Sequence, residues 1–97
     1  MYEEHARSIG RLVDRKNKAY GDSFRKSGDI LRFLYPEGIK PEQYDDMLAL
    51  ARIIDKMFRI ATSRDAFSEN PYTDIAGYAI LRSKQIEEEE KKQNEKI

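Results

Sequence analysis

The segment from Pro41 to Ser63 constrains the fold more than any other part of this 97-residue chain. Its apolar side chains recur at three- and four-residue spacing, which predicts an α-helix. They cover too broad an arc for a helix that lies on a surface with one face in water. We therefore expect a central helix that is packed by other helices, or that also faces a second subunit. The apolar positions are Tyr44, Met47, Leu48, Leu50, Ala51, Ile53, Ile54, Met57, Phe58, Ile60 and Ala61.

Amphipathic segments precede this central helix. Residues 2 to about 18 predict a helix with one apolar face, formed by Ala6, Ile9, Leu12 and Val13. It should end near Tyr20 and Gly21, because glycine tolerates the left-handed conformation just past a helix end. Asp22 or Ser23 can then cap a second, short helix. The side chains of that helix expected in the core are Phe24, Ile30, Leu31 and Leu34.

Turn and cap residues mark the other boundaries. Residues 35–38, Tyr-Pro-Glu-Gly, predict a turn, because proline pre-sets its backbone and Gly38 accepts a positive φ. After a loop at residues 64–70, Asn70 and Pro71 predict the start of a fourth helix, because asparagine favours the cap position and proline favours the first helical turn. The expected inner stripe of that helix is Tyr72, Ile75, Ala76, Ala79 and Ile86.

The fourth helix is expected to be long. Gly77 inside it costs about 1 kcal/mol relative to alanine, which indicates close approach of another helix backbone. Residues 87–97 have helix propensity but bury little, so they should extend the helix and fray. The prediction is an all-α fold, a compact bundle of about four helices with a long C-terminal helix. Residues 1–86 form its single domain and residues 87–97 a charged tail.

Composition removes several classes of chemistry. The chain has no cysteine, which excludes disulfides, thiolate catalysis and cysteine-based zinc sites. Its only histidine, His5, is assigned no role. The 18 basic residues balance 18 acidic ones, so no net field favours general duplex nucleic-acid binding. No apolar run approaches the roughly 20 residues of a membrane span, and no signal peptide is recognisable. We expect a cytoplasmic protein without a cofactor.

A basic stripe lies on the central helix. Arg52, Lys56 and Arg59 fall at positions i, i+4 and i+7 and so share one face. One interpretation is a solvated helix face on which Asp55 supports Arg59. The other is a phosphate site, in which the planar arginine fork and the lysine point charge contact phosphate oxygens. Spacing alone does not separate the two.

Two further groups of residues carry polar chemistry. The helix junction of residues 20–26 places an aromatic, a glycine, a hydroxyl and two cations together, and a helix N-terminus can hold an anion while an aromatic stacks on a base. Its candidate residues are Tyr20, Asp22, Ser23, Phe24 and Lys26. Alternatively, Asp22 and Ser23 only cap a helix and Phe24 is a core residue. The second group is the pair Asp74 and Tyr78, at i and i+4, although Asp74 also suits a helix start.

At these residues the chain resembles the phage-associated nucleotide-modification-associated domain 1 family. The matching segments are residues 20–24 with Lys26 and Gly28, residues 52–60, and residues 74–79. The resemblance implies a protein of an infected bacterial host cell with a small-nucleotide ligand. It implies that the ligand contacts Tyr20, Asp22, Ser23, Phe24, Lys26, Arg52, Asp55, Arg59, Asp74 and Tyr78. It supplies no reaction.

The helical layout is also loosely similar to MazG-type nucleotide pyrophosphohydrolases. Those enzymes bind magnesium through a Glu-x-x-Glu pair on one helix and a Glu-x-x-Asp pair on the next, which lets carboxylates share a hard cation. In this chain Asp74 is followed at that distance by Gly77, which departs from the motif.

Three functions stay open on the sequence. The preferred one is a homo-oligomeric, non-enzymatic binder of a small nucleotide that acts by sequestration, for instance of a nucleotide signal in host immunity. The second is a magnesium-dependent hydrolase or accessory factor for modified nucleotides that uses Asp45, Asp46, Asp55 and Asp74. The third is a scaffold that binds another protein.

Overall fold

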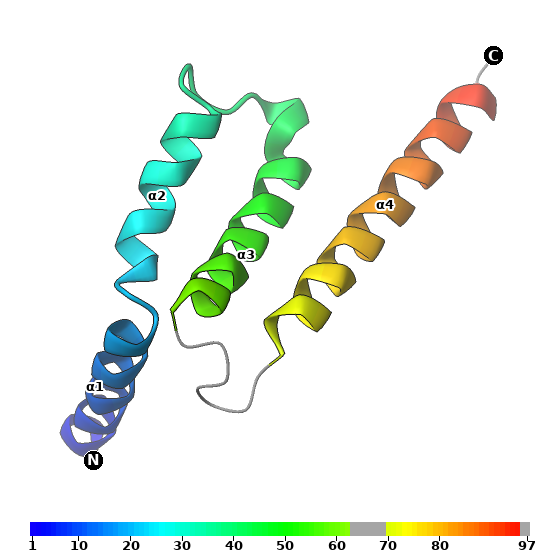
Figure 1. Cartoon of the computed structure of the whole chain (residues 1–97). Coiled ribbons are helices and arrows are strands. Elements are labelled where there is room, and N and C mark those ends of the chain that lie inside the picture. Colours follow the sequence, from blue (N-terminus) through cyan, green and yellow to red (C-terminus); the bar gives the residue numbers. More distant parts are fainter. Residues whose placement is uncertain (63–69, 96–97) are drawn as a thin grey trace.

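The computed structural model describes residues 1–62 and 70–95 and places four α-helices there (Figure 1). The elements are α1 (Tyr2–Ala19), α2 (Ser23–Leu34), the 3₁₀ turn η1 (Pro41–Gln43), α3 (Tyr44–Ala61) and α4 (Pro71–Glu95). No strand occurs in these ranges. The prediction of an all-α fold with a long C-terminal helix is therefore confirmed. None of the described helices combines the length and apolar character needed to cross a membrane.

The central position of α3 is also confirmed. α3 contacts α2 on one side and α4 on the other, and the three helices pack compactly (Figure 1). Ile54, in the middle of α3, has only 3% of its surface exposed. Its neighbours Leu50, Ile53 and Ile60 are half-buried, whereas Met57 is exposed. Most of the broad apolar arc is thus covered by helices of the same chain.

Helix α1 lies apart from this packed layer. It extends from the N-terminal end of α2, away from the other helices (Figure 1). None of its residues is buried. The molecule therefore measures 58 × 33 × 30 Å, with a radius of gyration of 17.4 Å. A compact chain of this length has a radius of gyration of about 13 Å. The core consists of α2, α3, α4 and the corner where α1 ends.

That corner contains two successive residues in the left-handed conformation. Gly21 has φ 64° as predicted, and Asp22 has φ 59°. The Asp22 amide donates a hydrogen bond to the Asn17 carbonyl over 3.0 Å, which completes a helix-ending motif. Tyr20 lies beside it with 4% of its surface exposed, and a Cβ on Gly21 would lie 3.2 Å from Cγ2 of Thr62. The corner therefore packs against the end of α3.

The other predicted boundaries agree with the structure. Gly38 has φ 92°, and its amide donates to the Tyr35 carbonyl over 3.1 Å, which closes the predicted turn. The Asn70 side-chain oxygen accepts a hydrogen bond from the Thr73 amide over 3.3 Å, so Asn70 caps α4 directly before Pro71. The predicted loop at residues 64–69 lies outside the described residues.

The predicted inner stripe of α4 was partly wrong. Ile75 is half-buried as expected, but Tyr72 and Ala76 are exposed, and the inner face instead includes the buried Pro71 and the half-buried Tyr78. The cap fixes Pro71 against the core, and the positions one and two turns later follow it inward. Among the described residues, no neighbouring atom lies within 4 Å of the place where a Cβ on Gly77 would stand. The backbone of the described helices therefore does not approach Gly77 closely, contrary to the prediction.

Candidate functional site

A groove between α2 and α3 brings five of the predicted site residues together. The hollow has a volume of about 390 Å³, and Tyr78 of α4 closes one side of it. We call it the α2–α3 groove. It exists because small side chains line it where the helices face each other. Its lining residues are Phe24, Ser27, Gly28, Leu31, Ala51, Arg52, Asp55, Lys56 and Tyr78.

Two cations of the basic stripe face this groove and are positioned by α4. The Arg52 guanidinium lies 5.6 Å from the centroid of the Tyr78 ring, a cation–π distance. Lys56 Nζ lies 3.3 Å from Oδ2 of Asp74, and only 12% of the Lys56 side chain is exposed. Arg52, in contrast, is exposed. Of the two, Arg52 is therefore the cation that an incoming anion can reach with the least rearrangement.

Phe24 forms the opposite rim of the groove, and its predicted place in the core was wrong. Its side chain is 94% exposed. The cause lies one residue earlier: Ser23 is buried and Ser27, one turn later, is half-buried, so the inner face of α2 runs through these serines. The Ser27 hydroxyl donates to the Ser23 carbonyl over 2.6 Å, which satisfies a polar group on this inner face. Phe24 consequently lies on the flank, where a flat ligand can reach its ring.

The remaining predicted residues do not line the groove: Asp74 lies on α4, where it pairs with Lys56, and the others lie at or near the α1–α2 corner. The Arg59 guanidinium lies 4.9 Å from the centroid of the buried Tyr20 ring, and Arg59 also lies 3.5 Å from Oδ2 of Asp55. Asp22 precedes α2 but makes no side-chain cap hydrogen bond within the described residues; its carboxylate pairs with Arg25 at 2.7 Å. Within this corner, Tyr20 and Arg59 join α1 to α3.

Ser23 and Lys26 both belong to the first two turns of α2. Ser23 is the first residue of α2 and is buried. The Lys26 amide donates to the Asp22 carbonyl over 3.2 Å, so this backbone donor is already used within the helix. The Lys26 side chain is exposed on the same helix as Phe24. Of the predicted junction residues, Phe24 lines the groove. Lys26, two residues later on α2, lies about half a helical turn away from Phe24 and does not line the groove.

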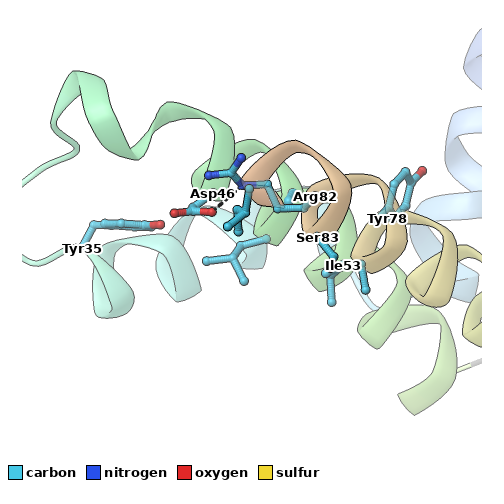
Figure 2. Close-up of a pocket in the computed structure, with 10 residues that line it drawn as sticks. Tyr35, Asp46, Ile53, Tyr78, Arg82 and Ser83 are labelled. Atoms are coloured by element: carbon cyan, nitrogen blue, oxygen red, sulfur yellow. Dashed lines mark hydrogen bonds and ion pairs between the residues drawn. The ribbon is translucent and has the colours of Figure 1, made fainter. Parts of the chain in front are cut away.

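Sequence reasoning missed a larger groove between α3 and α4, shown in Figure 2. Its volume is about 580 Å³. Arg82 Nε donates to Oδ1 of Asp46 over 2.7 Å, and the Tyr35 side chain points toward this pair (Figure 2). That hydrogen bond, more than any other cause, raises the pKa of the Arg82 guanidinium above its ordinary value. Its lining residues are Tyr35, Asp46, Ala49, Leu50, Ile53, Tyr78, Ala79, Arg82, Ser83 and Ile86.

The sequence did contain a signal for this groove. Tyr78 follows the buried Pro71 by seven residues and Arg82 follows Tyr78 by four, so the three share one helix face. A stripe drawn through polar as well as apolar residues would have placed Arg82 inward. Tyr78 lines both grooves, so it separates the two hollows.

The acids named for a magnesium site are spread over different ion pairs. Asp46 pairs with Arg82, Asp55 with Arg59, and Asp74 with Lys56. A Glu-x-x-Asp spacing does occur at Glu42 and Asp45, where both residues are exposed. In residues 1–62 and 70–95, no three acidic or histidine side chains converge as metal ligands would. The arrangement favours anion and ring contacts over cation coordination.

Comparison with known protein families, with curated protein sequences and with solved structures gives no match to this chain. The resemblance to the nucleotide-modification-associated family therefore stays a prediction that depends on the residues quoted for it.

Proposed function

We propose that this protein binds a small nucleotide in the α2–α3 groove and acts by sequestration, without chemical conversion of the ligand. The observation that carries the proposal is that an exposed aromatic ring, Phe24, and an exposed guanidinium, Arg52, line the same hollow. A nucleotide has a flat base and an anionic phosphate, and these two groups match the two side chains. A nucleotide signal of host immunity is the concrete ligand class we propose.

The contacts of each residue suggest how it would act. The Phe24 ring would stack on the base, and such stacking tolerates any base because every base has a π face. Arg52 would offer its planar fork to phosphate oxygens, while Tyr78 supports the guanidinium from behind. Lys56 would add a point charge, but it must share that charge with Asp74. The volume of about 390 Å³ falls within the range of roughly 300–1,000 Å³ found for ligand pockets.

The first experiment separates binding from catalysis. The full chain is incubated with a mixture of ribonucleotides, deoxyribonucleotides and linked dinucleotides, with and without magnesium, then washed, denatured and analysed by mass spectrometry. Recovery of intact nucleotide supports sequestration. Recovery of a hydrolysed product that depends on magnesium would favour the pyrophosphohydrolase instead. Retention of no nucleotide at all would contradict the proposal and favour the protein-binding scaffold.

The second experiment assigns the groove. Calorimetric titration with the retained nucleotide should show binding weakened by about 1.5–3 kcal/mol for Arg52→Ala, the value for a charge-assisted hydrogen bond. Phe24→Ala should cost about 1–3 kcal/mol, the value of one stacked base. Arg7→Ala and Phe33→Ala are controls, because both residues are exposed and neither lines the groove. Equal affinity for Arg52→Ala and Arg7→Ala would refute the assignment.

A further inference from the structure

Helix α1 has an apolar stripe that the described part of this chain does not bury. Tyr2, Ala6, Ile9 and Val13 follow one another at spacings of four, three and four residues, which is the spacing of a helix that pairs with another helix. None of the four is buried, and Ile9 and Val13 are about half exposed. The stripe is therefore suited to packing against a second helix.

α1 gains little stability from packing within the described part of the chain, because none of its residues is buried there. Most helical stability in proteins comes from packing of the apolar face, so a partner helix would stabilise α1. α1 has 18 residues, which at 1.5 Å per residue give a rod of about 27 Å. Within α1, Glu3 pairs with Arg7 at 2.6 Å, and this pair is exposed and contributes little.

The charge distribution along α1 identifies the partner and its direction. The first half has Glu3 and Glu4 against Arg7, and the second half has four cations against the single acid Asp14. The four cations are Arg11, Arg15, Lys16 and Lys18. An antiparallel copy of α1 would place its acidic end beside the basic end of the first helix, whereas a parallel copy would place like charges together. Antiparallel helix dipoles also attract each other.

We propose that α1 pairs in antiparallel orientation with α1 of a second copy of this chain. In this pair Ala6 and Ile9 of one helix face Ile9 and Ala6 of the other, and Tyr2 faces Val13. The C-terminal end of each α1 is joined to its own packed layer, so in an antiparallel pair the two layers lie at opposite ends of the paired helices. The proposal is independent of the proposed nucleotide site, because no α1 residue lines the α2–α3 groove.

Sedimentation velocity on the full chain tests the pairing. At about 50 μM, where a micromolar complex is largely assembled, the wild type should sediment as a dimer or a larger even-numbered species. The doubly substituted Ile9→Glu, Val13→Glu variant should weaken self-association at least tenfold. Phe33→Glu on α2 is the control, since Phe33 is 87% exposed and lies outside α1. A monomeric wild type, or an α1 variant that assembles like the wild type, would overturn the proposal.

Disulfide cross-linking tests the orientation and does not depend on the stability of the variants. The chain has no cysteine, so single substitutions report unambiguously. A mixture of Tyr2→Cys and Val13→Cys chains should cross-link mainly as mixed pairs, because the two positions face each other only in the antiparallel pair. If Tyr2→Cys chains cross-link mainly with one another, the helices pair in parallel and the proposed orientation is wrong.

Discussion

The contact between Arg59 and Tyr20 should contribute measurably to the stability of the fold. The guanidinium lies 4.9 Å from the ring centroid, only 4% of Tyr20 is exposed, and 14% of the Arg59 side chain is exposed. A cation–π contact that is largely removed from water contributes about 1–2 kcal/mol. Because Tyr20 ends α1 and Arg59 belongs to α3, this energy holds the corner against the central helix.

The expected magnitude for Arg59→Ala follows from the contacts of its guanidinium with Tyr20 and Asp55. The variant loses the ring contact and also the pair with Asp55, which is 3.5 Å long and whose acid is 44% exposed. Such a pair adds about 0.2–1 kcal/mol, because solvent screens it. The total loss is about 1.5–3 kcal/mol. For a domain of this size, each kcal/mol lowers the melting temperature by about 4–8 °C.

A double-mutant cycle isolates the contact. Urea unfolding followed by circular dichroism is measured for the wild type, Arg59→Ala, Tyr20→Leu and the double variant. The cycle is needed because neither single change alone measures the interaction. We expect a coupling energy of about 1 kcal/mol, in line with the contribution of a cation–π contact. Arg52→Ala should cost less, about 0.5–1 kcal/mol, because its ring contact with Tyr78 is exposed to solvent. A coupling energy below about 0.3 kcal/mol would mean that the effects are additive and that the two side chains do not stabilise each other.

Three further changes test local features of the fold. Gly21→Ala should destabilise by about 1–2 kcal/mol, because a side chain disfavours the left-handed backbone and its Cβ would press on Thr62; unchanged urea unfolding would contradict this. Gly77→Ala should instead stabilise α4 by about 0.5–1 kcal/mol, since its site is open in the described chain, and a lower melting temperature would reveal a helix packed there. Truncation after Ile86 should leave nucleotide affinity unchanged and stability nearly so, because residues 87–95 are exposed; a large loss of helicity elsewhere would show that the tail packs on a neighbour.

The parts of the fold that local backbone chemistry determines could be predicted from the sequence. Gly21 and Gly38 adopt the positive φ angles expected of them, and Asn70 caps α4 directly before Pro71. Positions that depend on packing were harder. Phe24 was assigned to the core by its apolar character, although two small serines fit closer to the core and the ring was left on the flank.

The candidate site was predictable in the same partial way. Spacing placed Arg52, Lys56 and Arg59 on one face of α3, and all three do use α4 or the α1–α2 corner as neighbours. Spacing could not divide them between a groove and a buried ring, because that division depends on where Tyr20 and Tyr78 arrive from other helices. Arg82 was missed because only apolar residues were used to define the inner face of α4.

The two left-handed residues at the α1–α2 corner also determine the reach of the molecule. α1 is a rod of about 27 Å that is attached to the packed layer at one end, so a rotation of about 10° at Gly21 and Asp22 would displace its N-terminal end by about 5 Å. That displacement is nearly equal to the rise of one helical turn, about 5.4 Å. A single change of backbone conformation at residue 22 would therefore alter the distance and angle between the two copies of the proposed dimer while each packed layer, and the groove within it, stays as it is.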